Sequence, residues 1–146
     1  MKIHQLSLFL ENKPGQLTEP CRLLAQAGIN IRTLNLADTE EFGILRLIVS
    51  DWQKGGKLLE EAGYVVNVTE VVAVEVPDRP GGLAELLAVF EHTDINIEYM
   101  YAFTFGRGET AVMIFRFNKP DAAIERLQSA GINVVGSSEV YSGIGK

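Results

Sequence analysis

Two stretches of the chain alternate apolar and polar residues in the way that half-buried β-strands do. Leu6, Leu8 and Leu10 alternate within residues 3–10, and Val72, Val74 and Val76 alternate within residues 71–76. Each stretch runs into a Pro-Gly pair and then into apolar residues at helical spacing. The apolar positions that predict the core face of the two helices are Leu17, Cys21, Leu24 and Ala27, and Leu83, Leu87 and Phe90. The pattern therefore predicts strand, turn and helix, twice.

The rest of each half follows one order. Residues 29–36 and 95–103 are rich in β-branched and aromatic residues and predict strands, as do residues 44–50 and 111–117. Gly43 and residues 106–108 mark turns. Residues 54–63 and 120–131 predict short helices, and residues 64–68 and 132–140 predict the closing strands. The expected core positions of these helices are Leu58, Leu59 and Ala62, and Ile124, Leu127 and Ala130.

The order strand, helix, strand, strand, helix, strand predicts the split β-α-β arrangement of ferredoxin-like folds. The expected fold class is α+β, with two tandem βαββαβ modules whose antiparallel sheets carry helices on one face. Pro20 lacks an N–H group and is tolerated only in the first turn of a helix, so the first helix should begin nearer Gln16 than Pro14.

The two halves are copies of one another. Pro14, Gly15, Leu17 and Glu19 recur as Pro80, Gly81, Leu83 and Glu85, and the segment Ile29-Asn30-Ile31 recurs as Ile95-Asn96-Ile97, all at an offset of 66 residues. Without a gap, 7 of 24 positions are identical between residues 11–34 and 77–100. This internal duplication predicts one module over residues 1–70 and a second over residues 71–146. Modules of this size are marginally stable alone, so each should pack on a neighbour.

The amino-acid composition excludes several classes of function. The formal net charge of −6 disfavours binding to a phosphate backbone. A single cysteine, Cys21, excludes an intramolecular disulfide. The N-terminus lacks the apolar run of a signal peptide, and no stretch is apolar over the ~18 residues that a membrane span needs. We therefore expect a soluble cytoplasmic protein without contact to membrane or nucleic acid.

The repeated turn carries the most suggestive chemistry. Each turn leads into a helix whose first N–H groups lack intrahelical partners and can bind an anion. Gly15 and Gly81 would let a ligand or backbone come close. Asn12 and Asp78 add side-chain oxygens that could hold an ammonium group. The combination suits a zwitterion. The alternative is a plain turn and helix cap, which a duplication would copy equally well.

These motifs resemble ACT domains, which are small regulatory modules of amino-acid metabolism. The resemblance rests on the motif Asn/Asp-Lys/Arg-Pro-Gly-x-Leu, the helix that follows it and the Ile-Asn-Ile strand. It covers nearly the whole chain, as two tandem modules. It implies that an amino acid binds between paired modules, at the turn, the start of the helix and the start of the second strand. The residues implied are Asn12, Lys13, Pro14, Gly15, Gln16, Leu17, Asn30 and Ile31, and Asp78, Arg79, Pro80, Gly81, Gly82, Leu83, Asn96 and Ile97.

The two expected sites differ. Serine-sensing members of the family carry a histidine where Leu10 and Val76 stand in this chain. The absence of this histidine argues against serine, so the identity of the bound amino acid stays undetermined. Asp78 replaces the asparagine of the first turn, so the first module is the more standard site. A ligand of about ten heavy atoms should bind roughly in the micromolar to millimolar range.

Other chemistry is sparse. His4, His92 and Cys21 cannot form a closed zinc site within a chain, no nucleophile elbow or phosphate loop is present, and no cofactor is expected. Cys21 lies on an apolar stripe and should be inert. The alternating aromatics Tyr99, Tyr101 and Phe103 indicate sheet packing or, alternatively, a ligand wall. The acidic pairs Glu40-Glu41 and Glu60-Glu61 indicate solvated faces.

We expect a non-enzymatic regulatory protein that forms a homodimer, responds to an amino acid and acts through a partner enzyme or regulator. The alternatives are a scaffold, or a regulatory subunit with no ligand of its own. An RNA-binding domain and a ferredoxin-like enzyme are less compatible with the charge and the missing acid–base cluster.

Overall fold

The structure is a computed structural model that describes residues 1–38, 41–104, 106 and 108–143. The chain divides into two compact units, His4–Thr69 and Met1–Ile3 together with Glu70–Lys146. We call these the first and the second module. Arg107 and Glu40, which belong to a predicted turn and a predicted acidic pair, lie outside the described residues.

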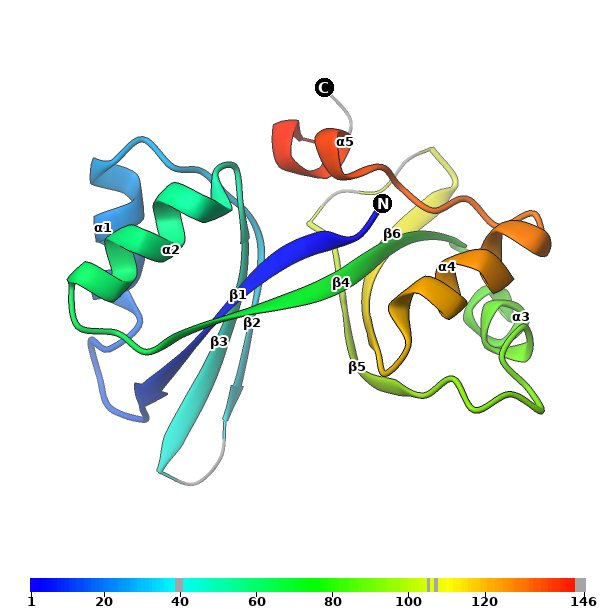
Figure 1. Ribbon diagram of the computed structural model, residues 1–146, viewed down its shortest axis with the longest axis horizontal. Helices are drawn as coiled ribbons and strands as arrows, with labels where there is room; N and C mark the ends of the chain where they lie inside the picture. The colour runs from blue at the N-terminus through cyan, green and yellow to red at the C-terminus, as the bar shows by residue number, and fades with distance from the viewer. Residues whose placement is uncertain (39–40, 105, 107, 144–146) are drawn as a thin grey trace. The chain divides into compact units, whose positions relative to one another are not determined.

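The first module has the predicted order of elements. It contains β1 (Ile3–Glu11), α1 (Thr18–Gln26), β2 (Ile31–Asp38), β3 (Phe42–Val49), α2 (Trp52–Glu61) and the first residues of β4 (Val66–Pro77). Its strands lie in the order β2-β3-β1-β4, and β3 is antiparallel to β1 and to β2. The helices α1 and α2 contact each other on one face of this sheet (Figure 1).

The alternating leucines of β1 form the floor of the first core, as the pattern predicts. Leu6 and Leu8 are fully buried against Leu24 of α1 and Leu59 of α2. Gly55 allows α2 to approach closely, because a Cβ atom at this position would lie 3.3 Å from the side chains of Leu24 and Val49. The core is therefore closed between both helices and the sheet.

The second module repeats the arrangement on the second half of β4. It continues with α3 (Gly82–Ala88), β5 (Ile97–Ala102), β6 (Thr110–Phe117), α4 (Pro120–Ser129) and α5 (Ser137–Ser142). Antiparallel β6 lies between β4 and β5, and α3 and α4 lie beside each other (Figure 1). The valines of β4 pack with Phe115, Phe117 and Leu127 in the core. The fold is thus the predicted pair of ferredoxin-like modules.

Two predicted boundaries are wrong. The strands expected at 64–68 and 71–76 form one continuous strand, β4, because no Gly or Pro separates them. The closing strand expected at 132–140 is reduced to a single bridge between Val134 and Val74, and residues Ser137–Ser142 form α5. Gly136 ends the extended stretch at the point where Ser-Ser-Glu opens the helix.

The predicted core face of the early helices is partly wrong. The predicted positions Leu24 and Phe90 are buried, whereas Leu17, Leu83 and Leu87 are 37–38% exposed. The prediction missed two further buried residues, Pro20 in α1 and Leu86 in α3. Ala62 and Ala130 are also exposed, because they are the C-caps of α2 and α4.

Pro20 explains where α1 begins. The helix starts at Thr18, so that Pro20 stands in its first turn, where the missing N–H group costs no hydrogen bond. In the second module Leu86 stands at the equivalent position, and α3 starts earlier, at Gly82. The aromatics Tyr101 and Phe103 are each only 7% exposed, which favours the packing interpretation of that strand.

Candidate functional site

The repeated turns share one unusual backbone geometry. Gly15 and Gly81 both have φ of +85°, a left-handed conformation that favours glycine. A Cβ atom at either position would meet nothing within 4 Å. These two glycines are therefore required by the path of the turn. The close approach expected of them occurs instead at Gly82, where a Cβ atom would lie 2.0 Å from the carbonyl oxygen of Pro77.

A cavity of about 70 Å³ lies beside the turn of the first module. Its origin is Gly43 in the middle strand, since register aligns Gly43 with Leu10 of β1 on one side and with Asp38 of β2 on the other. Neighbouring strands are about 4.8 Å apart, so a gap of roughly 10 Å between Leu10 and Asp38 has no side chain in its middle. The cavity is lined by Leu10, Glu11, Asn12, Lys13, Gln16, Leu17, Leu36, Asp38 and Gly43.

Donors and acceptors surround this cavity. The side-chain amides of Asn12 and Gln16 make no hydrogen bond within the described part of the chain, and neither do the N–H groups of Gly15 and Leu17. Leu17 is the N-cap of α1 and offers no side-chain oxygen to the first turn. The turn thus presents uncapped N–H groups to an anion. About 70 Å³ accommodates several water molecules, or the charged head group of a small zwitterion.

The turn of the second module uses the same positions differently. Arg79 forms a bidentate ion pair with Glu85 in the first turn of α3, with distances of 2.9 and 2.7 Å. The equivalent Lys13 instead pairs with Glu11 at 2.6 Å. Gly82 lines a separate, more apolar cavity of about 260 Å³ between α3 and the segment before Val134. The second turn is therefore engaged with its own helix.

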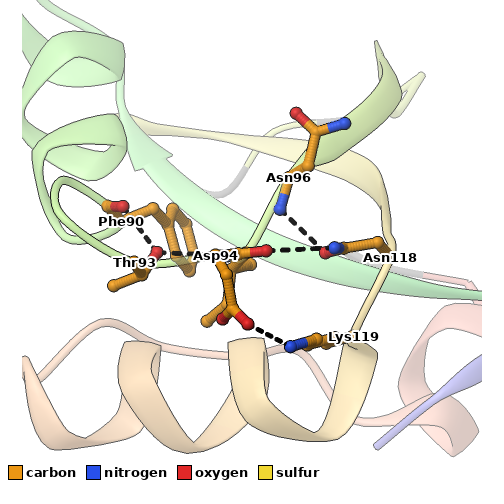
Figure 2. Close-up of polar contacts among 7 residues, drawn as sticks. Phe90, Thr93, Asp94, Asn96, Asn118 and Lys119 are labelled. Carbon is orange, nitrogen blue, oxygen red and sulfur yellow. Dashed lines mark hydrogen bonds and ion pairs between the residues drawn. The ribbon is translucent and has the colours of Figure 1, made fainter.

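Asn30 and Asn96 occupy equivalent, rigidly held main-chain positions. The Asn30 N–H donates to Ser50 Oγ at 3.0 Å, and the Ser50 N–H donates back to the Asn30 carbonyl at 2.8 Å. In the second module the Asn96 N–H donates to Asn118 Oδ1 at 2.7 Å, and the Asn118 N–H donates back at 3.1 Å (Figure 2). The amide side chains of Asn30 and Asn96 are exposed and make no bond among the described residues.

Further contacts support this position in the second module. Asn118 Nδ2 donates to the Asp94 carbonyl at 3.0 Å, and Thr93 Oγ1 donates to the Phe90 carbonyl at 2.6 Å (Figure 2). Lys119 forms an ion pair with Asp94 and lowers the pKa of that carboxyl group. The segment that leads into β5 is therefore tied to the end of β6 and the start of α4.

Replacing Asn118 by alanine should loosen this segment. The change removes the acceptor for the Asn96 N–H and the donor to Asp94, and we expect a loss of about 1 kcal/mol in unfolding free energy. Thermal unfolding should show a decrease of roughly 3 °C in Tm. Asn133→Ala is the control, because only the main chain of this exposed residue bonds, to Glu75. Equal Tm values for both variants would mean that the Asn118 side chain does not hold the segment.

Asn12 and Asn30 lie at opposite ends of the first sheet. Asn12 follows the end of β1 beside the start of β3, whereas Asn30 precedes the start of β2 beside the end of β3. Asn12 is level with Glu41 and Asn30 is level with Ser50, so nine residues along the chain through β3 separate them, which is roughly 30 Å at about 3.3 Å per residue. Asp78 and Asn96 are separated in the same way along β6. One module alone does not bring the two predicted asparagines together.

The remaining predicted site residues have structural surroundings. Pro14 and Pro80 are exposed in the turns, and Leu83 is exposed on α3. Ile31 and Ile97 are half-buried and pack against the cores of their modules. Leu36, Asp38 and Gly43 line the first cavity although sequence reasoning did not single them out as ligand contacts. The glycine between two apolar strands was the available signal, and it was interpreted as a turn.

Other reactive groups show no sign of a site. Cys21 is half-buried, and this burial raises the pKa of its thiol. Within the described ranges no three His, Cys, Asp or Glu residues are grouped as metal ligands would be. Among those same residues, no helix combines the length and apolar character that crossing a membrane requires.

Comparison with known proteins establishes the family. The profile of the ACT domain pair matches residues 1–142. The chain therefore belongs to the ACT domain pair family. Among solved structures it is similar to the protein BT0572 from Bacteroides thetaiotaomicron, with 40% identity, a TM-score of 0.89, and coverage of 97% of this chain and 96% of that one.

Two further similarities involve named regulatory subunits. The acetolactate synthase small subunit of Buchnera aphidicola subsp. Baizongia pistaciae is 32% identical over 77 residues, which are 49% of this chain and 48% of that protein. The chain thus matches about half the length of this curated relative. The regulatory subunit of aspartate kinase from Thermus thermophilus shares the fold, with a TM-score of 0.61 and 19% identity over 87% of this chain and 91% of that one.

Proposed function

We propose that this protein binds an amino acid beside the β1–α1 turn of its first module and passes the signal to a partner enzyme. The cavity above Gly43 is the observation that carries the proposal. It lies where the family resemblance predicts a ligand, and four of its lining residues, Asn12, Lys13, Gln16 and Leu17, are predicted site residues. The free N–H groups of the adjoining turn suit a carboxylate, and the side-chain oxygens of the lining residues suit an ammonium group.

The first module is the better candidate for the site. Its turn has free donors, whereas Arg79 and Glu85 of the second turn bind each other. An external carboxylate at the second turn would have to compete with Glu85 for Arg79. Binding of about one amino acid per chain is the expected stoichiometry.

A second copy of the chain would complete the site. The outer strand of the first sheet is β2, and antiparallel pairing with β2 of another copy would bring Asn30 of the partner subunit beside Asp38. This arrangement would unite two asparagines that are roughly 30 Å apart within one module. A ligand between two copies would couple its binding to their packing, which is how such a site could transmit a signal.

The partner is proposed from the relatives. An acetolactate synthase small subunit and an aspartate kinase regulatory subunit are both named as parts of larger enzymes. By analogy, this protein would regulate an enzyme of amino-acid metabolism. A scaffold that binds no ligand is the competing interpretation, and the engaged turn of the second module is the observation in its favour.

Thermal unfolding in the presence of each of the twenty amino acids distinguishes an amino-acid-binding regulator from a scaffold. A ligand at 100 times its Kd stabilises the folded chain by about 2.7 kcal/mol, which corresponds to a Tm increase of roughly 5–10 °C. Asn12→Ala and Asn30→Ala should each reduce that increase, while the exposed Asn67→Ala serves as control. If none of the twenty amino acids changes Tm, the scaffold interpretation is favoured instead.

A further inference from the structure

We infer that Asp38 recognises the ammonium group of the ligand, an assignment that rests on the proposed function of the same cavity. Asp38 is the last residue of β2 and aligns with Gly43, whose missing side chain opens the cavity between Asp38 and Leu10. Asp38 lines this cavity together with Asn12 and Gln16, and strand register places its exposed side chain on the face of the sheet that also carries Leu10. Its carboxylate therefore borders the space in which a small zwitterion would lie.

The charges around the cavity leave Asp38 available. Three of the described lining residues are ionisable, and two of them, Glu11 and Lys13, form an ion pair at 2.6 Å. The side chain of Asp38 has no hydrogen bond or ion pair within the described part of the chain. The cavity consequently carries one uncompensated negative charge, which favours a ligand that brings a positive charge.

The other groups determine how the ligand would be oriented. The N–H groups of Gly15 and Leu17 and the amide of Asn12 are on the turn. Asp38 is on the outer strand of the sheet. A 2-amino acid can direct its carboxylate to the turn and its ammonium group to Asp38. A 2-hydroxy acid of the same shape keeps the first contact and loses the second.

The second module lacks this chemistry at the corresponding positions. At the repeat offset, Thr104 stands where Asp38 stands. Register aligns Val76, the counterpart of Leu10, with Ala111, whereas Leu10 is aligned with Gly43. The second module thus has neither the carboxylate nor the glycine. Recognition of an ammonium group by a residue such as Asp38 is therefore confined to the first module.

The test compares matched pairs of ligands by calorimetry on the full chain. The probes are L-alanine and L-lactate, L-serine and L-glycerate, and L-leucine with L-2-hydroxyisocaproate, followed by the same comparison for any other amino acid found to bind. We expect Asp38→Asn to weaken the amino acid about 10- to 100-fold, the range for a lost hydrogen bond to a charged group. Affinity for the hydroxy acid should remain within about threefold of the original protein.

The controls separate the possible failures. Glu60→Gln, on the exposed side of α2, changes the net charge equally and should leave both affinities unchanged. Asp38→Glu keeps the charge and should retain preference for the amino acid. If Asp38→Asn binds the amino acid as tightly as the original protein, the assignment of Asp38 is overturned while the proposed function stands. If no amino acid binds the original protein, both are overturned.

Discussion

Gly82→Ala is expected to lower the stability of the protein by about 3 kcal/mol, the upper part of the usual range for overpacking. The added Cβ atom would lie 2.0 Å from the carbonyl oxygen and 3.0 Å from the carbonyl carbon of Pro77. Both partners are backbone atoms at the junction of β4 and α3, so neither can move away as a flexible side chain would. The start of α3 would have to shift, and the Leu86 packing would shift with it.

Thermal or urea unfolding would show the effect as a Tm decrease of roughly 10 °C. Gly136→Ala is the matched control, since a Cβ atom there meets nothing within 4 Å and its φ of −68° is allowed for alanine. The control should stay within about 0.5 kcal/mol of the original protein. A Gly82→Ala protein as stable as this control would show that α3 does not begin against Pro77.

The repeat itself makes the Gly82 position informative. Its counterpart in the first module is Gln16, which carries a full side chain in the same turn. Gln16 is tolerated because α1 starts at Thr18, whereas α3 starts at Gly82. Pro20 accounts for the difference, because a helix that began at Gln16 would need an N–H group at residue 20. A single proline, present only in the first module, thus makes the helix start differ between two otherwise similar turns.

Periodicity and repetition were enough to predict most of the fold. The alternating leucines of β1 and valines of β4 identified the core face, and the duplicated Pro-Gly turn identified two modules in register. Two features depended on tertiary context instead. The stretch after Ile132 has strand-like composition but makes only one bridge before α5, and Leu83 shares helical spacing with core residues without being buried.

The cavity beside the first turn could be predicted only in part from the sequence, for a related reason. Sequence motifs located the turn, and Asn12 and Gln16 do line a cavity there. Asp38 and Gly43 were missed because they join the site through strand register, which no local pattern encodes. The roughly 30 Å between Asn12 and Asn30 could not be foreseen either, since it follows from the parallel directions of β1 and β2 beside β3.

Gly43→Ala should abolish much of the ligand affinity while leaving the fold intact. The new methyl group would occupy the space between Leu10 and Asp38 that forms the cavity of about 70 Å³. Its nearest neighbour would be Leu36 Cδ1 at 3.1 Å. That side chain is 49% exposed and can rotate, but any rotation that relieves the contact changes the cavity wall. We expect Kd for the amino acid to rise at least about tenfold, or ~1.4 kcal/mol.

Stability should change little in this variant, which makes the result interpretable. Glycine within a strand is destabilising by roughly 0.5–1 kcal/mol relative to alanine, and this gain offsets the contact with Leu36. The φ of Gly43 is not positive, so alanine is compatible with the backbone. Calorimetry would measure Kd, with thermal unfolding as the check on folding and Gly136→Ala as the control. Unchanged binding by a folded Gly43→Ala protein would exclude this cavity as the ligand site, because no ligand could occupy the space that the methyl group fills.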